Sequence, residues 1–308
     1  MKKVILDVDT GVDDAMAIVY AAHSPELELI GITTCFGNVT VAEATRNTLA
    51  VLEKLDKPVP VIEGAKETLR RGEKARYSRH VHGEDGLGNT LSTPPQGQAQ
   101  PGIAADYIID QVTRYPGELT IIAVGPLTNL ALAIEKEPGI VTLVKEVIVM
   151  GGAVTVPGNV TPYGEANIVA DPEAAAVVFG SGLPLTLVGL DVTLQTLLPR
   201  TQLDAWRSSG RNDAIFLAEM SEFYMGFYES TYPGKGGCGL HDPLAVGVAV
   251  DPSLVRVEPM RVTVITEGDQ TGRTVGTTEG EPKISVCTGV DADRFLKHFT
   301  SRIIGGEV

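Results

Sequence analysis

Four aspartates, Asp7, Asp9, Asp13 and Asp14, stand close together near the start of the chain, in the stretch MKKVILDVDTGVDDA. Carboxylates at such spacing raise one another's pKa values and cost free energy unless a proton or a cation offsets their charge. Oxygen donors without His or Cys suit a hard cation, Ca²⁺ or Mg²⁺. An EF-hand is excluded, because neither reading frame gives that loop its Gly at position six and its Glu at position twelve. The alternative is that Asp7 and Asp9 are solvated and that Asp13 and Asp14 merely begin a helix, whose dipole favours negative charge there. With four aspartates together, we favour a cation site.

The same stretch allows a second chemistry, phosphoryl transfer. Residues 7–10 (DVDT) resemble the DxDxT start of the haloacid dehalogenase-like phosphatases, in which the first Asp is the nucleophile and Mg²⁺ assists. That family also needs a downstream Lys and a later acidic pair after a strand. The nearest candidate, Asp269, lacks its acidic partner. A Mg²⁺-dependent phosphatase that forms a phospho-aspartate at Asp7 stays open as an alternative.

A further candidate ligand lies far along the chain, in the sequence His241-Asp242-Pro243. These residues follow a Gly-rich loop and precede an apolar helical run. Taken alone, a Pro after Asp is typical of a helix start, with Asp242 as the cap and His241 incidental. Taken with the first aspartates, Asp242 could complete a cation site begun by Asp9 and Asp14. His241 would then be a proton donor that titrates near neutral pH.

Polar and aromatic side chains elsewhere could hold an organic ligand. Asn159, Glu165 and Asn167 follow a predicted strand. Two amides with a carboxylate suit the hydroxyl groups of a sugar, although Asn beside Gly is also ordinary turn chemistry. Tyr224 and Tyr228 are four residues apart and so share one face of a predicted helix. Such a pair is more often core packing, and it could equally wall an aromatic ligand.

Short apolar, β-branched runs alternate with helical patterns along most of the chain. The predicted strands cover residues 4–8, 29–34, 59–62, 119–124, 146–150 and 185–190. The predicted helices cover residues 14–22, 41–55, 103–114, 129–135, 172–179, 212–228, 244–250 and 291–303. This alternation predicts an α/β fold with an open, mainly parallel, Rossmann-like sheet covered by helices on both faces. Two later extended runs, 261–266 and 273–277, predict a hairpin.

The predicted sheet brings the polar candidates to one edge. Ligands of open parallel sheets bind at the carboxyl ends of the strands. The strand over 4–8 ends among the aspartates, and the strand over 119–124 ends at Val124, whose backbone carbonyl is predicted to face the same crevice. We therefore expect the aspartates and this carbonyl to lie close together.

Composition and charge narrow the class of protein. The 308 residues, 43% of them hydrophobic, suffice for a large core, and a single domain over residues 1–308 is predicted. A net charge of -14 disfavours nucleic acid as a partner, since phosphate binding needs clustered Lys and Arg. Three scattered cysteines disfavour a zinc site and a disulfide framework and are typical of a reducing compartment. The apolar run after Lys3 is too short for a signal peptide, and no run approaches a membrane span of ~18 residues, so a cytoplasmic protein without a membrane partner is predicted.

Together these motifs resemble the inosine-uridine preferring nucleoside hydrolase family. The motifs that carry the resemblance occur in the family's order and are residues 7–15 (DVDTGVDDA), 33–38 (TTCFGN), 82–88 (HGEDGLG), 125–129 (GPLTN), 150–152 (MGG), 165–167 (EAN), 171–174 (DPEA) and 241–243 (HDP). The family's opening usually reads DxDPGxDD, and here Thr10 replaces the Pro. Each motif alone is weak, whereas eight in order over most of the chain are highly specific.

The resemblance implies an enzyme that hydrolyses the N-glycosidic bond of ribonucleosides with Ca²⁺, giving ribose and free base through an oxocarbenium-like transition state. The implied calcium ligands are the carboxylates of Asp9, Asp14 and Asp242 and the backbone carbonyl of Val124. Asp7 would support this site from behind, and Asp13 would be the general base for a calcium-bound water. The implied ribose contacts are Asn38, Met150, Asn159, Glu165 and Asn167. The residues implied to lie near the base are His82, Tyr224, Tyr228 and His241, with His241 as the candidate acid for the leaving base.

The resemblance also suggests a homo-oligomer, a tetramer or a dimer, and a ribonucleoside as the small-molecule partner. It leaves the preference for purine or pyrimidine bases open, because loops around residues 76–90 and 222–240 decide that preference. Beside the hydrolase and the phosphatase, a non-catalytic nucleoside- or sugar-binding protein of the same fold remains as a third hypothesis. The presence of both Asp13 and His241 disfavours it, because binding alone needs neither.

Overall fold

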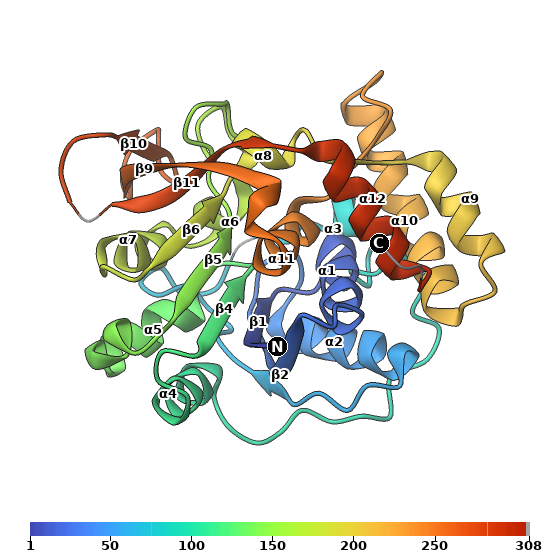
Figure 1. The fold of residues 1–308 in the computed structure, drawn as a ribbon, viewed down its shortest axis with the longest axis horizontal. Helices are drawn as coiled ribbons and strands as arrows, with labels where there is room; N and C mark the ends of the chain where they lie inside the picture. Colours follow the sequence, from blue (N-terminus) through green and yellow to red (C-terminus); the bar gives the residue numbers. More distant parts are fainter. Residues whose placement is uncertain (75, 282, 306–308) are drawn as a thin grey trace.

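The computed structural model describes residues 1–74, 76–281 and 283–305, and a large central sheet organises it (Figure 1). The sheet has nine strands in the order β10-β9-β11-β6-β5-β4-β1-β2-β3. In chain order its strands are β1 Lys2–Val8, β2 Leu27–Thr34, β3 Val61–Glu63, β4 Leu119–Ala123, β5 Glu146–Met150, β6 Leu185–Val188, β9 Val255–Val264, β10 Thr274–Thr277 and β11 Ile284–Val290. The neighbouring pairs among β3, β2, β1, β4, β5, β6 and β11 are parallel. At the other edge of the sheet, β9 pairs antiparallel with both β11 and β10. The prediction of an open, mainly parallel α/β sheet is confirmed.

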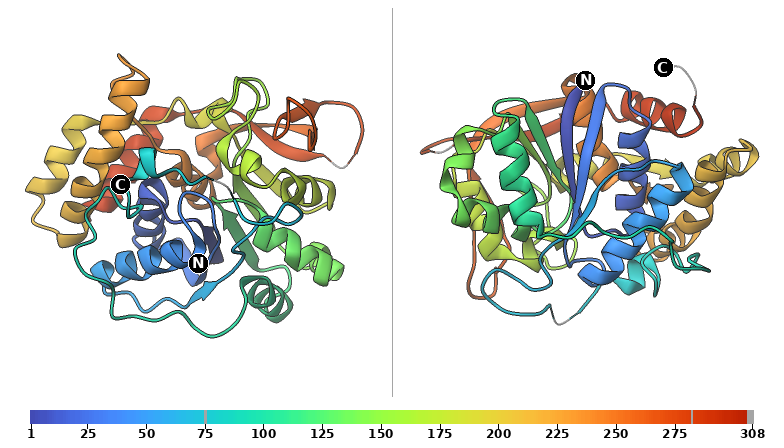
Figure 2. Two further views of the ribbon diagram at one scale, coloured as in Figure 1. Left: turned by 180° about the vertical axis from the view of Figure 1, so that it is seen from behind. Right: turned by 90° about the horizontal axis from the view of Figure 1, so that it is seen from below.

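Helices lie on both faces of this sheet, as the views from behind and from below show (Figure 2). In chain order the α-helices are α1 Val12–Ala22, α2 Val41–Leu55, α3 Arg79–His82, α4 Ala104–Arg114, α5 Thr128–Lys136, α6 Ala166–Ala170, α7 Pro172–Gly180, α8 Leu190–Thr193, α9 Arg200–Ser208, α10 Asn212–Thr231, α11 His241–Val250 and α12 Ala292–Ile303. Two 3₁₀ turns, η1 Pro138–Thr142 and η2 Pro252–Leu254, and a small antiparallel ribbon of β7 Leu197–Pro199 with β8 Gly237–Gly239 complete the described elements. Within the described part of the chain, no helix combines the length and the low polarity that a membrane span requires.

The apolar run of β1 shows why both faces are covered. Successive side chains of a strand point to opposite faces. Val4, Leu6 and Val8 accordingly belong to one core, packed with α1, α2, α10, α11 and α12, whereas Ile5 belongs to a second core, packed with α4, α5 and α7. A strand that is apolar on both sides is therefore buried on both sides, as a central parallel strand must be.

The last third of the chain was predicted only in part. The predicted hairpin is present as β9 and β10, whose register pairs Arg261 with Thr277 and Val264 with Thr274. Strand β11 was missed, although it joins this hairpin to β6. Elsewhere the short helices α3, α6, α8 and α9 and the ribbon strands β7 and β8 were missed as well, because elements of three to nine residues carry little periodic signal.

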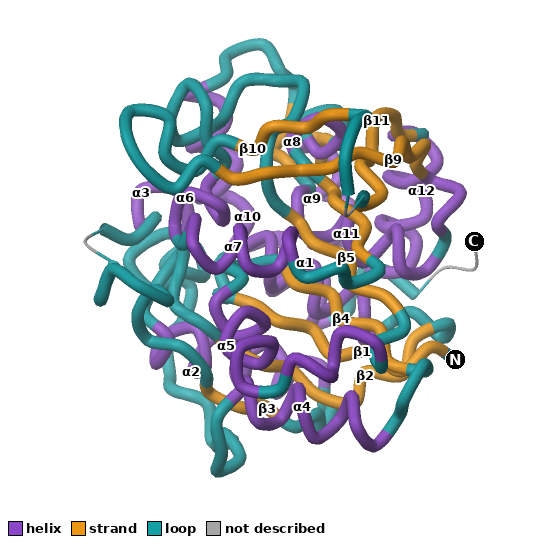
Figure 3. Tube along the Cα trace, turned by 90° about the vertical axis from the view of Figure 1, so that its left-hand side faces the viewer, coloured by secondary structure: helices purple, strands orange, loops and turns teal. Residues whose placement is uncertain are grey.

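The carboxyl ends of the central strands form one edge of the sheet, on the side opposite to the two chain termini (Figure 3). The chain runs from β1 outward to β2 on one side and returns to β4 on the other side of β1, so the strand order reverses beside β1. Ligand sites of open α/β sheets lie at such a reversal. Asp9, Val124 and Gly151 directly follow the carboxyl ends of β1, β4 and β5.

Candidate active site

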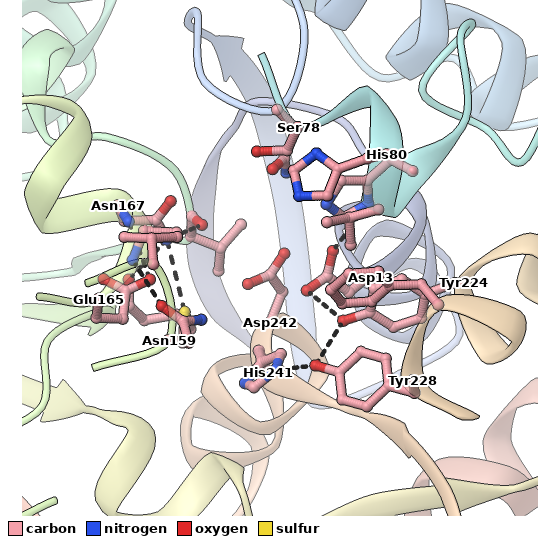
Figure 4. A pocket seen from close by; sticks show the side chains of 18 of the residues that line it. Asp13, Ser78, His80, Asn159, Glu165, Asn167, Tyr224, Tyr228, His241 and Asp242 are labelled. Atoms are coloured by element: carbon pink, nitrogen blue, oxygen red, sulfur yellow. Dashed lines mark hydrogen bonds and ion pairs between the residues drawn. The ribbon is translucent and has the colours of Figure 1, made fainter. Parts of the chain in front are cut away.

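Three carboxylates from two distant parts of the chain meet at this edge. Asp13 and Asp14 lie in the first turn of α1, and Asp242 lies in the first turn of α11. Each of the three offers an oxygen within 4.8 Å of the other two, and all three residues are buried. Helices α1 and α11 pack against each other, which brings Asp242 beside Asp13 (Figure 4). The positive ends of both helix dipoles favour negative charge at this point.

The fourth carboxylate, Asp9, lies beside Asp14. The backbone N–H of Asp9 donates to Asp14 Oδ1 (3.0 Å), and the backbone N–H of Asn38 donates to Asp9 Oδ2 (2.6 Å). Two glycines allow this close packing, because a Cβ would lie 1.9 Å from Asp9 Oδ2 at Gly37 and 2.8 Å from Asp9 Oδ1 at Gly125. The structure thus brings together Asp9, Asp13, Asp14 and Asp242, the aspartates that the family resemblance implied as cation ligands and general base.

The chemistry of this cluster fits a hard divalent cation. Asp9 Oδ1 and Asp13 Oδ1 are buried and have no hydrogen-bond partner among the described residues. Burial, followed by the charge of Asp14, raises the pKa of Asp13 to about 8 and holds the pKa of Asp9 well above its usual range. Burial and the neighbouring aspartates also raise the pKa of Asp242. Unpartnered oxygens and carboxyls that resist ionisation are what a bound cation would offset.

Asp7 is separated from this cluster. It is fully buried, its Oδ1 accepts hydrogen bonds from Thr33 Oγ1 (2.5 Å) and Asn129 Nδ2 (2.8 Å), and burial raises its pKa to about 6. It does not line the pocket above the cluster. A phosphate ester bound in the pocket could not contact Asp7, which the phosphatase alternative requires as its nucleophile. This position of Asp7 argues against that alternative.

Amide and carboxylate groups form one wall of the pocket (Figure 4). Glu165 caps α6, and its two oxygens accept backbone N–H groups, including that of Asn167 (2.9 Å). The side-chain amide of Asn167 donates to the carbonyls of Val124 (2.7 Å) and Met150 (3.2 Å). Asn159 Oδ1 accepts the first N–H of α6 (3.1 Å). The Val124 carbonyl, predicted as a cation ligand, lines the pocket and keeps a second lone pair.

Aromatic groups form the opposite wall (Figure 4). His241 Nε2 lies 2.6 Å from Tyr228 Oη, and Tyr224 Oη donates to Asp13 Oδ2 at 3.4 Å. The ring of His82 stacks on Tyr224 with centroids 5.5 Å apart. Burial lowers the pKa of His241 to about 4 and the pKa of His82 to about 3, so both rings are neutral at pH 7.

Most of the predicted site residues line one pocket. They are Asp13, Asn38, His82, Val124, Met150, Asn159, Glu165, Asn167, Tyr224, Tyr228, His241 and Asp242. Asp9 and Asp14 lie behind them and reach the pocket wall through Asn38, whose side chain donates to Asp14 Oδ2 (3.1 Å).

Sequence reasoning missed several lining residues, among them His80, Phe227 and Tyr232. Tyr232 continues the four-residue spacing of Tyr224 and Tyr228, so its position could have been predicted. His80 packs edge-on against Phe227, with ring centroids 5.8 Å apart. This contact joins two segments far apart in sequence and leaves no local signal.

The pocket at the strand ends has an acidic floor, and comparison of the chain with known families shows the class of protein to which it belongs. The family model described as inosine-uridine preferring nucleoside hydrolase matches residues 4–297. The chain belongs to this family, as the motifs indicated, and it is an N-ribohydrolase that acts on nucleosides.

Individual relatives differ in the bases for which they are named. The probable uridine nucleosidase 1 of Oryza sativa subsp. japonica is 42% identical over 89% of this chain and 84% of its own length. The pyrimidine-specific ribonucleoside hydrolase RihB of Escherichia coli (strain SE11) is 38% identical over 89% of this chain and 87% of its own. The solved purine-preferring ribonucleoside hydrolase from Gardnerella vaginalis is 45% identical, covers 99% of this chain and 98% of its own, and superposes with a TM-score of 0.95.

Proposed function

We propose that this protein hydrolyses the N-glycosidic bond of ribonucleosides with Ca²⁺ at the acidic cluster, giving ribose and free base. One observation carries the proposal: a cluster of buried carboxylates, of which Asp9 and Asp13 have an unpartnered oxygen, lies at the floor of a pocket with one hydrophilic and one aromatic wall. A ribonucleoside has the matching division, since its sugar carries hydroxyl groups and its base is a flat aromatic ring.

The proposed cation ligands are the carboxylates of Asp9, Asp14 and Asp242 and the carbonyl of Val124. Ca²⁺, when bound, supplies oxygen-ligand positions for the ribose hydroxyls and for the attacking water, and it makes that water more acidic. The donor set suits either Ca²⁺ or Mg²⁺, and the proposal of Ca²⁺ rests on the family resemblance.

Asp13 is the proposed general base. It lines the pocket, and its Oδ1 lacks a hydrogen-bond partner while its Oδ2 accepts from Tyr224. A carboxylate held in this way by one oxygen can take a proton from water with the other.

The hydrophilic wall would hold the sugar. We propose that Asn38, Met150, Asn159, Glu165 and Asn167 contact the ribose. The charge of Glu165 would stabilise the positive charge that develops on the ring as the glycosidic bond lengthens. The backbone bonds to Glu165 fix its position before the substrate binds, so little reorganisation is needed during the reaction.

The aromatic wall would hold the base. His82, Tyr224 and Tyr228 are proposed to contact it, and His241 with Tyr228 is proposed to donate a hydrogen bond or proton to it as it leaves. The 2.6 Å contact between Nε2 and Tyr228 Oη supports this role, because one hydrogen bond joins the two groups and a proton can pass along the pair toward the base.

The proposal is tested by ribose release from inosine, adenosine, guanosine, uridine and cytidine, with Ca²⁺ and after chelation. We expect chelator-sensitive release from ribonucleosides and little from 2′-deoxyuridine, which lacks one of the hydroxyls that the cation would bind. No release from any of the five by the Ca²⁺-loaded protein would leave a non-catalytic binder as the better hypothesis. Because relatives are named for both base types, the panel also measures base preference.

Replacing His241 with Ala is expected to lower kcat on uridine and inosine by about 10²-fold, with a smaller change in KM, because a donor to the leaving base acts mainly in the transition state. Steady-state kinetics on both nucleosides measures the effect. The control substrate is p-nitrophenyl β-D-ribofuranoside, whose phenolate leaves without a proton, and on which the loss should be much smaller. An equal loss on all three substrates would contradict the role of His241 at the leaving base.

A further inference from the structure

Thr193, the last residue of α8, contacts the ring nitrogen of His241 that faces away from the pocket's aromatic wall. Its hydroxyl lies 2.8 Å from Nδ1, on the opposite side of the ring from the bond between Nε2 and Tyr228. Both nitrogens of this buried ring are therefore occupied. The arrangement raises the question of which nitrogen carries the hydrogen.

The hydroxyl of Thr193 settles the direction of its bond. Thr193 is fully buried, and Nδ1 of His241 is the only hydrogen-bond partner of its hydroxyl among the described residues. A buried O–H without an acceptor destabilises the folded protein. If Nδ1 carried a hydrogen, the Thr193 O–H would have no acceptor. The satisfied arrangement has the hydroxyl donating to a bare Nδ1, and the hydrogen of the neutral ring on Nε2.

The backbone holds Thr193 in this place. Its N–H donates to the Gly189 carbonyl (3.1 Å), and its carbonyl accepts from Thr196 Oγ1 (3.0 Å). The carbonyl of Thr196 in turn accepts the N–H of Leu240 (2.9 Å), the residue before His241. Helix α8 and the start of α11 are thereby fixed in register, and Thr193 stays opposite Nδ1.

The other side of the ring is equally constrained. A Cβ at Gly239 would lie 2.5 Å from His241 Nε2 and 2.6 Å from Tyr228 Oη. The absence of a side chain at Gly239 therefore leaves room for the contact between Nε2 and Tyr228. The ring cannot turn over without losing both of its hydrogen bonds.

We propose that Thr193 is a positioning residue that fixes His241 in the tautomer with its hydrogen on Nε2, where it donates to Tyr228 Oη on the pocket's aromatic wall, so that a proton can reach the leaving base from Nε2 directly or through the Tyr228 hydroxyl. The inference rests on the role of His241 proposed above. Thr193 itself does not line the pocket, so it acts through His241 and not on the substrate.

Thr193→Val keeps the shape of the side chain and removes the donor, and Thr193→Ser keeps the donor. We expect Thr193→Val to lower the ratio of kcat on uridine to kcat on p-nitrophenyl β-D-ribofuranoside by about tenfold, less than loss of the donor itself. Thr193→Ser should restore the ratio to within about threefold of the wild type. An equal fall on both substrates, or an unchanged ratio in Thr193→Val, would overturn the proposal.

A second measurement observes the tautomer of His241 directly. In protein labelled with ¹⁵N-histidine, the resonances of His241 are assigned by their absence from His241→Gln. We expect the wild type to show a protonated Nε2 and an unprotonated Nδ1 at neutral pH, and Thr193→Val to show a mixture. A hydrogen on Nδ1 in the wild type would refute the inference about Thr193, even if ribose release confirms the hydrolase. A protein that releases no ribose would instead refute the proposed function and leave the tautomer measurement intact.

Discussion

Asp13→Asn is expected to lower kcat on ribonucleosides by about 10²–10⁴-fold, the range that a positioned general base contributes. Asn has the shape of Asp and can still accept a hydrogen bond from Tyr224, but it cannot take a proton from water. KM should change much less, because the walls that hold the sugar and the base stay in place. Steady-state and single-turnover kinetics on uridine and inosine measure the effect.

The comparison variant for Asp13 is Asp9→Asn. Both residues have a buried oxygen without a partner, so the static structure alone ranks them closely. The difference is that Asp13 lines the pocket and Asp9 lies behind it. If Asp13 is the base, Asp13→Asn should keep the thermal stabilisation by Ca²⁺ and lose turnover, whereas Asp9→Asn should lose both. Turnover lost in Asp9→Asn with Ca²⁺ binding kept would move the role of base to Asp9.

Parts of the site and of the fold could be predicted from the sequence where neighbouring residues alone determine the local structure. The pair Asp13 and Asp14 lies at the start of a helix, and α2 has the predicted bounds because Thr40 and Glu43 form a capping box ahead of an apolar stripe. The order of the motifs predicted that Asp242 joins the first aspartates. The packing of α11 on α1 is the physical reason why these residues lie together.

Other parts of the site depend on contacts that no local pattern encodes. Thr193 is separated from His241 by two helices and the β7–β8 ribbon, and the pairing of this ribbon together with the backbone bond from Leu240 to Thr196 sets them opposite each other. His82 is held in place by the backbone N–H of Val12, which donates to its Nδ1 (3.1 Å), and burial keeps the ring neutral. Neither partner could be inferred from residue type, since a buried Thr or a backbone amide at a helix start is ordinary in any α/β protein.

Removing the cation is expected to make stability fall as pH rises. The pKa of Asp13 is raised from 3.8 to about 8, and those of Asp9 and Asp242 are also raised, so the folded state binds more protons than the unfolded state in this range. The free energy of unfolding of the chelated protein should therefore be highest below the unfolded pKa and decrease as pH rises through the folded value. Saturating Ca²⁺ should oppose this loss, adding about 2.7 kcal/mol at a hundredfold excess over its Kd.

Urea unfolding at pH 5, 6, 7 and 8, with Ca²⁺ and with chelator, measures this linkage. Asp242→Asn is the decisive variant, because it removes one charge from the cluster and one proposed ligand. In chelator at pH 8 it should be more stable than the wild type, since three buried carboxylates repel one another less than four, and it should gain little from Ca²⁺. Asp110→Asn, at an exposed position on α4, is the matched control and should follow the wild type in both conditions. A chelated wild type whose stability does not fall between pH 5 and pH 8, together with an unchanged Ca²⁺ response in Asp242→Asn, would show that the buried aspartates do not form the cation site.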